Sequence, residues 1–310
     1  MIVVTGAAGF IGSNLVRGLN RIGRDDLLLV DDVPEAAART RRGLEGLRCA
    51  AWLEPEALLE AAPRLRIEAI LHQGACTSTT EPDVRKMMKA NLEYSTRLLA
   101  RADQVGARLI YASSAAVYGH GERGFREEPG CEGPLNPYAR SKLLFDELVR
   151  ARHASSALAP SRVVGLRYFN VYGPGEDHKG DMASLPLQLW RQIERTGRAE
   201  IFEGSEGFRR DFVFVDDVVA ANMHFLAHPD IEGIFNCGSG AARSFADLAR
   251  CVVRLHGRGE LVWIRFPAHL EGRYQVHTCA DLEQLRGAGF GRRPVALEEG
   301  LSRYCADLAA

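Results

Sequence analysis

The sequence lacks the features that mark several classes of protein. No two of its seven cysteines form a CxxC pair, and they are scattered over the chain at Cys49, Cys76, Cys131, Cys237, Cys251, Cys279 and Cys305. This distribution favours reduced thiols in the cytoplasm over a disulfide framework or a metal site. The formal net charge is only -1, so the bulk composition gives no sign of a nucleic-acid or membrane-surface partner.

Long apolar stretches, internal repeats and low-complexity tracts are missing as well. No apolar run approaches the ~18 residues of a transmembrane helix. Residues 2–4 already read as a first strand, so we expect no signal peptide before the fold. What remains is an ordinary composition, with 46% hydrophobic and 25% charged residues in a chain of 310. Such a chain is long enough for one large domain, or for one and a half, around a sizeable core.

Apolar runs alternate with amphipathic segments over the first 170 residues. The sequence predicts strands at 2–4, 27–30, 69–71, 109–112 and 163–167, and helices at 10–19, 83–102 and 138–152. This alternation predicts the α/β class, with a Rossmann-type doubly wound parallel sheet.

Beyond residue 170 the pattern loosens. The glycine-rich, charged run 173–181 predicts a loop, and helical patterns follow at 182–195, 216–227 and 245–256. We expect a cofactor-binding domain over 1–170 and a smaller C-terminal α/β substrate lobe over 171–310. The two are expected to be interleaved, with segments around 212–240 returning to the first.

A glycine-rich turn follows the first strand and opens the first helix. Gly6, Gly9 and Gly12 allow a tight turn, let backbone N–H groups approach a pyrophosphate, and present the positive end of a helix to it. The alternative is a glycine turn that binds no ligand. Asp31 ends the second strand, where an acidic residue accepts hydrogen bonds from the adenosine ribose, which favours NAD.

Three arginines that follow Asp31 in the sequence favour NADP instead. Arg39, Arg41 and Arg42 could bind the 2′-phosphate of NADP through their guanidinium groups, although for any one of them a place on a solvated face is the favoured reading. The cofactor predicted here is NADP, with NAD as the alternative.

A tyrosine and a lysine four residues apart stack on one face of a predicted helix. Tyr138 and Lys142 have this spacing, and Ser113-Ser114 lies upstream at the end of a strand. An ammonium close to a phenol lowers the pKa of the phenol, which could then take a proton from a substrate hydroxyl. Together with the glycine turn, this pattern predicts a dinucleotide-dependent oxidoreductase site.

These motifs resemble the extended short-chain dehydrogenase/reductase superfamily. Further runs resemble one branch of it, the ADP-L-glycero-D-manno-heptose 6-epimerases: His72–Glu81, Arg167–Pro174, His178–Gly180, Met182–Ser184, Phe202–Ser205, Arg209–Val213 and Gly272–Gln275. The resemblance extends nearly from end to end. It implies an isomerase that converts ADP-D-glycero-D-manno-heptose to its L-glycero epimer, a precursor of the lipopolysaccharide inner core. It also implies tightly held NADP and a homo-oligomer, perhaps a homopentamer.

The resemblance also implies roles for individual residues. The catalytic residues it implies are Tyr138, Lys142, Ser114 and a second acid/base, Lys179. The cofactor would be bound by Gly6, Gly9, Phe10, Ile11, Gly12, Asp31, Asp32, Arg39, Gln73, Gly74, Ala75, Asn91, Tyr138, Lys142 and Val171. The substrate would be bound by Ser114, Asn170, Asp181, Gln188, Phe202, Glu203, Gly204, Ser205, Arg210 and Tyr274.

The sequence departs from this branch in places. Residues 32–66 match it poorly, and Asp181 and Gln188 stand where Ser and His are expected. A different sugar-nucleotide epimerase or a 4,6-dehydratase remains an alternative, although Ala115-Ala116 after the serine argues against the dehydratase. A catalytically idle dinucleotide-binding sensor is disfavoured because the tyrosine and the lysine are both present.

Overall fold

The computed structural model describes residues 1–39, 44–77, 83–155, 162–267 and 275–309. Its strands are β1 (Ile2–Thr5), β2 (Leu27–Val30), β3 (Ala51–Leu53), β4 (Ala69–His72), β5 (Arg108–Ser114), β6 (Val163–Tyr168), β7 (Asn170–Tyr172), β8 (Arg198–Phe202), β9 (Arg209–Phe214), β10 (Gly233–Cys237), β11 (Ala242–Ser244) and β12 (Glu260–Ile264). Its α-helices are α1 (Phe10–Arg21), α2 (Glu35–Arg39), α3 (Pro55–Ala61), α4 (Val84–Met88), α5 (Tyr94–Val105), α6 (Pro137–Ser155), α7 (Leu185–Thr196), α8 (Val215–Ala227), α9 (Phe245–His256), α10 (Glu283–Gly287) and α11 (Leu297–Ala309).

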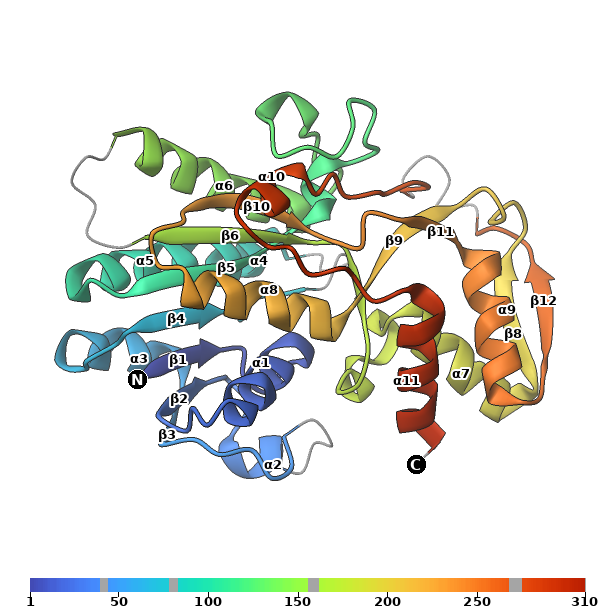
Figure 1. Ribbon diagram of the computed structural model, residues 1–310, viewed down its shortest axis with the longest axis horizontal. Helices are drawn as coiled ribbons and strands as arrows, with labels where there is room; N and C mark the ends of the chain where they lie inside the picture. The colour runs from blue at the N-terminus through green and yellow to red at the C-terminus, as the bar shows by residue number, and fades with distance from the viewer. Residues whose placement is uncertain (40–43, 78–82, 156–161, 268–274, 310) are drawn as a thin grey trace.

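Seven parallel strands form the main sheet, in the order β10-β6-β5-β4-β1-β2-β3. The chain builds outward from β1 in one direction and then from β4 in the other, so the order reverses between these two strands. In a doubly wound sheet the crevice at this reversal, beyond the carboxyl ends of the strands, is where ligands bind. In Figure 1 these carboxyl ends point toward the smaller lobe.

Two apolar layers cover the main sheet. Alternate residues of its strands pack with α1 and α8 on one face, and the other alternate residues pack with α3, α5 and α6 on the opposite face. All four residues of β1 are buried. This explains why the short strands read as continuous apolar runs, since a parallel sheet that is buried on both faces needs apolar side chains on both.

The smaller lobe lies beside the carboxyl ends of the main sheet (Figure 1). It contains a three-stranded sheet, β11-β9-β7, and the parallel pair β12-β8, packed with α7, α9 and α11 around a separate apolar core. The chain enters this lobe at β7 and leaves it for α8 and β10, which belong to the larger layer and the main sheet. The cleft described below lies where the two lobes meet.

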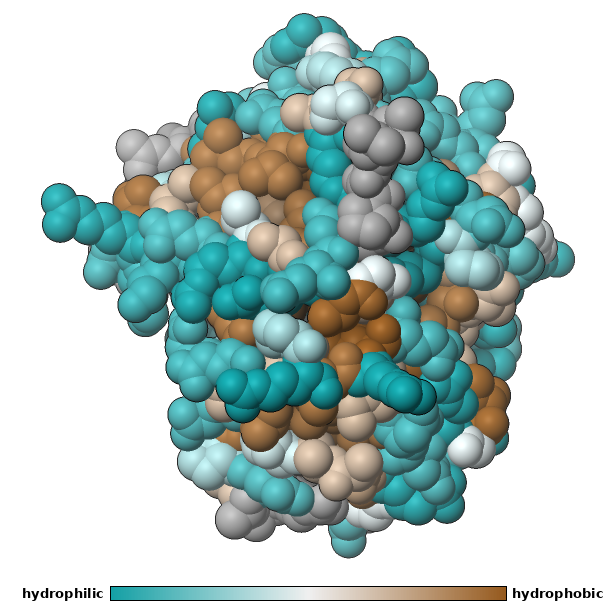
Figure 2. Space-filling view, turned by 90° about the vertical axis from the view of Figure 1, so that its left-hand side faces the viewer, coloured by the Kyte–Doolittle hydropathy of each residue, from teal (hydrophilic) through white to brown (hydrophobic). Residues whose placement is uncertain are grey.

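Figure 2 shows the opposite end of the molecule, where the strands of the main sheet begin. Hydrophilic residues cover most of this face, and separate hydrophobic areas interrupt them. Among the described residues no helix combines the length and the apolar character that crossing a membrane would need.

The predicted strands and helices of both halves are confirmed, with ends that differ by a few residues. The helix predicted over 83–102 is continuous through α4, a π-helical turn at Lys89–Glu93, and α5. The loop predicted over 173–181 is wrong in one part, because Asp177–Met182 forms a 3₁₀ helix with a kink at Gly180. Arg41, Arg42 and Tyr274 lie outside the described residues.

Candidate active site

A cleft of 1210 Å³ lies along the carboxyl ends of β1, β2, β4 and β5 and extends toward the smaller lobe. Its walls come from the glycine turn, the segments that follow β2 and β4, the start of α6, and the residues around β7 and α7. Residues far apart in the sequence therefore meet here, as expected for the crevice of a doubly wound sheet. The volume is large for a small-molecule site, and it suits a dinucleotide together with a second ligand.

The glycine turn is built for close backbone approach. Gly6 has a φ of +64°, and a Cβ placed on it would lie 2.6 Å from the nitrogen of Gly74. Any side chain there would therefore collide with the segment that follows β4. Gly9 precedes the first residue of α1, so the helix N-terminus faces the cleft without a side chain above it.

Asp31 fastens the glycine turn to the end of β2. Its carboxylate accepts hydrogen bonds from the backbone N–H groups of Ala8, at 2.8 Å, and Val33, at 3.1 Å. Burial raises the pKa of Asp31 to about 6, with a further rise from Asp32, while the two N–H donors lower it. Asp31 and Asp32 both line the cleft, so this end of it has an acidic wall.

The tyrosine, lysine and serine of the predicted catalytic set meet at one point in the cleft. Tyr138 and Lys142 lie on α6, Ser114 ends β5, and all three line the cleft. The ammonium of Lys142 donates a hydrogen bond to the carbonyl of Ala112 at 2.9 Å. The helix therefore presents the predicted face to the strand end.

The pKa pattern differs from the sequence-based expectation. Burial raises the pKa of Tyr138, and a hydrogen bond with Ser114 lowers it; Lys142 is not among the causes. The expected lowering of the tyrosine pKa by the lysine is therefore wrong for this state of the protein. Burial instead lowers the pKa of Lys142 to about 8, against an opposing effect of Asp146.

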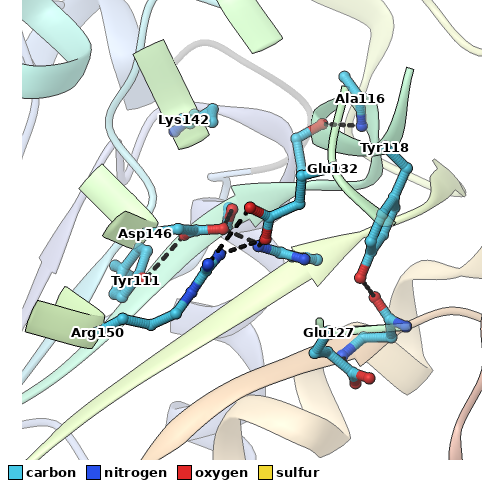
Figure 3. A network of polar contacts seen from close by, with 12 residues as sticks. Tyr111, Ala116, Tyr118, Glu127, Glu132, Lys142, Asp146 and Arg150 are labelled. Atoms are coloured by element: carbon cyan, nitrogen blue, oxygen red, sulfur yellow. Dashed lines mark hydrogen bonds and ion pairs between the residues drawn. The ribbon is translucent and has the colours of Figure 1, made fainter. Parts of the chain in front are cut away.

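A buried ionic network lies behind these residues (Figure 3). Asp146, one helical turn beyond Lys142, accepts hydrogen bonds from Tyr111 at 2.8 Å, Ser113 at 2.9 Å and Arg167 at 2.9 Å. The side chains of Asp146 and Arg167 are both 0% exposed. Arg167 also pairs with Glu132, which in turn pairs with Arg150, two turns along α6 from Lys142.

Lys179 faces the same cleft from the smaller lobe. Its ammonium lies 3.8 Å from a carboxylate oxygen of the buried Glu176 and 5.2 Å from the centre of the Phe10 ring. Phe10 belongs to the glycine turn, so this lysine links the turn to the second lobe. Burial lowers the pKa of Lys179, and Glu176 raises it.

Most of the other predicted cofactor residues line the cleft: Ile11, Gly12, Asp32, Gln73, Gly74, Ala75 and Val171. Asn91 does not, because its side chain holds the segment after β4 from behind. Its Oδ1 accepts from the Cys76 N–H at 2.8 Å, and its Nδ2 donates to the Cys76 carbonyl at 3.0 Å. The backbone of Arg39 ends α2, and its side chain lies outside the described part.

The predicted substrate residues divide into two groups. Asn170, Arg210 and Gln188 line the cleft. The amide of Gln188 donates to the carbonyls of Asp181, at 3.0 Å, and Ala183, at 2.8 Å, so it holds the Lys179 turn against α7.

Several residues predicted to bind substrate are absent from the cleft lining as described: Asp181, Phe202, Glu203, Gly204 and Ser205. Ser205 is buried and donates its hydroxyl hydrogen to the carbonyl of Phe202. The ring of Phe202 packs edge-on against Phe266. Phe202 is the last residue of β8, and Glu203, Gly204 and Ser205 form the turn that follows it.

Sequence reasoning missed part of the lining, including Thr5, Glu56, Cys76, Lys86 and Lys89. The composition contained a signal for Lys86 and Lys89, because lysine is rare in this chain. The chain has 39 basic residues, of which only Lys86, Lys89, Lys142 and Lys179 are lysines, and all four line the cleft. Among the described residues no group of three or more His, Cys, Asp and Glu is arranged to hold a metal ion.

Comparisons of sequence point to one group of enzymes. The model of the NAD dependent epimerase/dehydratase family matches residues 2–238. A Pseudomonas aeruginosa protein named ADP-L-glycero-D-manno-heptose-6-epimerase is 47% identical over 331 residues, which cover 99% of this chain and 98% of that protein. A protein of the same name from Brachyspira hyodysenteriae is 45% identical over 309 residues, which cover 98% of this chain and 96% of that protein.

Solved structures agree with the sequence comparison. The crystal structure of Helicobacter pylori ADP-L-glycero-D-manno-heptose-6-epimerase matches with a TM-score of 0.86 and 30% identity, over 100% of this chain and 96% of that one. The UDP-glucose 4-epimerase of Thermus thermophilus in complex with NAD matches with a TM-score of 0.81 and 26% identity, over 100% of this chain and 99% of that one.

Proposed function

The chain belongs to the NAD dependent epimerase/dehydratase family, and we propose that it inverts C6 of the heptose in ADP-D-glycero-β-D-manno-heptose to give the L-glycero epimer. One observation carries this proposal. Tyr138 and Lys179, two groups able to exchange protons, face one cleft from different lobes, and the cleft begins at a dinucleotide-type glycine turn.

The cleft fits a nicotinamide dinucleotide. The space that a Cβ on Gly6 would fill is closed by Gly74, so bare backbone forms this wall, and the start of α1 faces it. The glycine turn and Asp31 would hold the pyrophosphate and the adenosine end, and Lys142 the nicotinamide ribose. When bound, the dinucleotide supplies a hydride acceptor that can return the hydride to either face of a planar carbon.

Tyr138 and Ser114 both act on the oxygen atom of the reacting carbon. The phenolate of Tyr138 takes the hydroxyl proton as the alcohol becomes a ketone, and the Ser114 hydroxyl donates a hydrogen bond to that oxygen. Burial holds the Tyr138 pKa above its ordinary value, and the hydrogen bond with Ser114 opposes this rise, so Ser114 is the neighbouring group that favours the phenolate.

Lys179 provides the second proton partner. C6 lies outside the sugar ring, so rotation of the two-carbon arm is enough to present the opposite face of the ketone. The oxygen then points to another part of the cleft, where one acid/base on α6 no longer reaches it. Lys179 faces the cleft from the smaller lobe, and burial lowers the pKa of its ammonium, which makes proton transfer near neutral pH easier.

The decisive experiment is direct conversion. Purified protein is incubated with ADP-D-glycero-β-D-manno-heptose, and the C6 proton of the heptose is followed by NMR. Appearance of the L-glycero signal supports the proposal. No conversion of this substrate, together with turnover of UDP-glucose in a parallel sample, would assign the chain to a 4-epimerase on the same scaffold.

Lys179→Met separates the two proton partners. The variant keeps the length of the side chain but removes the ammonium, so net epimerisation should be lost while Tyr138 still supports oxidation and reduction at one face. Dismutation of a substrate analogue with an aldehyde at C6, measured as paired acid and alcohol products, should persist. A Lys179→Met protein that epimerises like the wild type would leave Tyr138 to serve both faces.

The cofactor proposed is NADP, with NAD as the alternative. The arginines that follow Asp31 in the sequence and the internal recycling of the hydride support tightly held NADP. The acidic wall that Asp31 and Asp32 form in the cleft supports NAD. Denaturing the purified protein and assaying the released nucleotide decides between them. Recovery of NAD alone, without uptake of added NADP, would exclude NADP.

The roles of the two lobes, the use of the product and the oligomeric state are proposed from the resemblance to the heptose epimerases. The larger lobe would bind the cofactor and the smaller lobe mainly the sugar nucleotide. The product would serve as a cytoplasmic precursor of the lipopolysaccharide inner core, and the protein would act as a homo-oligomer. Light scattering at several protein concentrations measures the oligomer, and a monomeric mass throughout would contradict that part.

A further inference from the structure

Glu176 is a fully buried carboxylate beside the lysine that faces the cleft. Its side chain is 0% exposed, whereas that of Lys179 is 25% exposed. Glu176 accepts hydrogen bonds from both the backbone N–H and the hydroxyl of Ser184, the residue before α7. It also accepts one from the hydroxyl of Tyr304, at 3.0 Å. This carboxylate thus joins three parts of the smaller lobe.

We propose that Glu176, held in place by Tyr304 of the C-terminal helix α11, is a positioning residue that fixes the Lys179 ammonium on the cleft wall. The inference rests on the proposed function, in which Lys179 is the second proton partner. It adds that α11, although distant in sequence from every catalytic motif, is part of the device that presents this lysine.

The local backbone leaves Lys179 dependent on such a support. Lys179 lies in the short 3₁₀ turn Asp177–Met182, in which no residue is buried. Gly180 breaks this turn with a φ of +53° and a ψ of -127°, a combination that residues with a side chain rarely adopt. A turn of this length has little stability of its own, so contacts to packed elements must fix its side chains.

Helix α11 connects Glu176 to the apolar core of the smaller lobe. Tyr304 is 1% exposed and packs in the apolar core of the smaller lobe with Leu301 and Leu297. Its ring cannot move without disturbing this core, so the hydroxyl gives Glu176 a fixed donor. Tyr172 attaches the same helix to β7 by donating to the carbonyl of Leu297 at 3.4 Å.

The surrounding charges single out the Glu176–Lys179 pair. Of the charged groups on the described neighbouring elements, Asp177 pairs with Arg191 at 3.5 Å, and His178 and Arg210 line the cleft. Glu176 is the charged group whose effect on Lys179 opposes that of burial. Replacing this carboxylate by a neutral amide should therefore lower the pKa of Lys179 further, because the partly buried ammonium loses its counter-charge.

Lys179 can be observed directly because the chain has only four lysines. Reductive methylation with ¹³C-formaldehyde keeps the charge and gives each lysine an NMR signal, and Lys179→Arg identifies the relevant one. In Glu176→Gln the titration midpoint of Lys179 should fall by about one pH unit or more, as expected for losing an opposite charge within ~4–6 Å. Glu176→Asp, which keeps the carboxylate, should give a midpoint between the two.

Asp217→Asn is the matched control. Asp217 is also buried, accepts hydrogen bonds from Arg292 and the Val295 N–H, and lies outside the cleft lining. This variant also removes the charge of a buried carboxylate and should leave the Lys179 midpoint unchanged. Tyr304→Phe keeps the Glu176 charge but removes its donor, so kcat should fall several-fold with KM nearly constant.

Unchanged Lys179 midpoints in both Glu176 variants would overturn the positioning role, and so would a wild-type kcat in Tyr304→Phe when Lys179→Met is inactive. If Glu176→Gln does not fold, Glu176→Asp and Tyr304→Phe carry the test. The titration uses no substrate, so it is independent of the reaction. A shifted midpoint combined with a fully active Lys179→Met would support the positioning role and refute the proposed role of Lys179 in epimerisation.

Discussion

At the scale of single residues, burial disfavours the charged forms of the two central groups of α6. Burial raises the pKa of the Tyr138 phenol and lowers the pKa of the Lys142 ammonium to about 8, so both effects oppose the charged forms. A ligand that brings its own charges into the cleft would change this balance. Strongly perturbed groups that share a cleft are typical of catalytic sites.

Tyr138→Phe should reduce epimerisation by at least ~100-fold, the lower range for a positioned acid/base. Only the phenol oxygen is lost, so cofactor content should stay near that of the wild type. Tyr118→Phe is the control, because this buried hydroxyl donates to Asn236 Oδ1 at 2.6 Å and neither residue lines the cleft. Initial rates by NMR measure both variants, and an active Tyr138→Phe protein would refute the assignment.

Lys142 should make the stability of the protein depend on pH. Below pH 8 the side chain is protonated in both the folded and the unfolded states, and folding bears the full cost of burying it. Between pH 8 and pH 10.5 the folded state gives up the proton first, so stability rises with pH. Relative to Lys142→Met, the unfolding free energy of the wild type should increase by up to about 3 kcal/mol over this interval. Urea unfolding at several pH values measures it, and a constant difference between the two proteins would contradict the pKa.

At the scale of elements, α6 is attached to β5 at three successive helical turns. Tyr138 meets Ser114, Lys142 donates to the carbonyl of Ala112, and Asp146 accepts from Ser113. The register between helix and strand is therefore fixed by the residues that form the site and by the one directly behind them. Asp146 contributes most to fixing this register, since it also accepts hydrogen bonds from Tyr111 and Arg167.

Asp146→Asn should lower the free energy of unfolding by about 3–5 kcal/mol, because it leaves the fully buried Arg167 short of a counter-charge. The remaining partner, Glu132, pairs with Nη2 of the same guanidinium. Glu68→Gln breaks an ion pair with Arg24 in which Glu68 is 53% exposed, and it should cost less than about 1 kcal/mol. Similar losses in the two variants, measured by denaturant unfolding, would show that the network contributes little.

At the scale of the whole molecule, the site exists only where the two lobes meet. The larger lobe supplies the glycine turn, Ser114 and the α6 pair, and the smaller lobe supplies Arg210 and the Lys179 turn. Phe10 and Lys179 lie in contact across this junction. A ligand that fills the cleft therefore touches both lobes and stabilises their arrangement.

Cofactor at about a hundredfold excess over its Kd should raise the unfolding free energy by about 2.7 kcal/mol, since it binds the folded state alone. Gly6→Ala should abolish this gain, because the added Cβ would lie 2.6 Å from the Gly74 nitrogen. Gly23→Ala is the matched control: its φ is +78°, and its Cβ would meet no atom within 4 Å. Both variants carry the same backbone strain, so thermal unfolding with and without cofactor isolates the effect on binding. A full stabilisation of Gly6→Ala would contradict the role of the turn.

The sequence by itself determined the elements, the fold class and the positions of the principal motifs. Short apolar runs between amphipathic segments identify buried parallel strands, and the spacing of Tyr138 and Lys142 places them on one helix face whatever the rest of the chain does. These are local properties, set by the periodicity of the backbone.

Only the tertiary structure decided what surrounds those motifs. Burial reversed the expected change in the Tyr138 pKa, since desolvation depends on all neighbouring elements and not on one lysine. The inward role of Asn91, the four-lysine lining of the cleft and the link from Tyr304 through Glu176 to Lys179 join segments up to 128 residues apart. No local pattern encodes such contacts, because they arise from the way in which the two lobes pack.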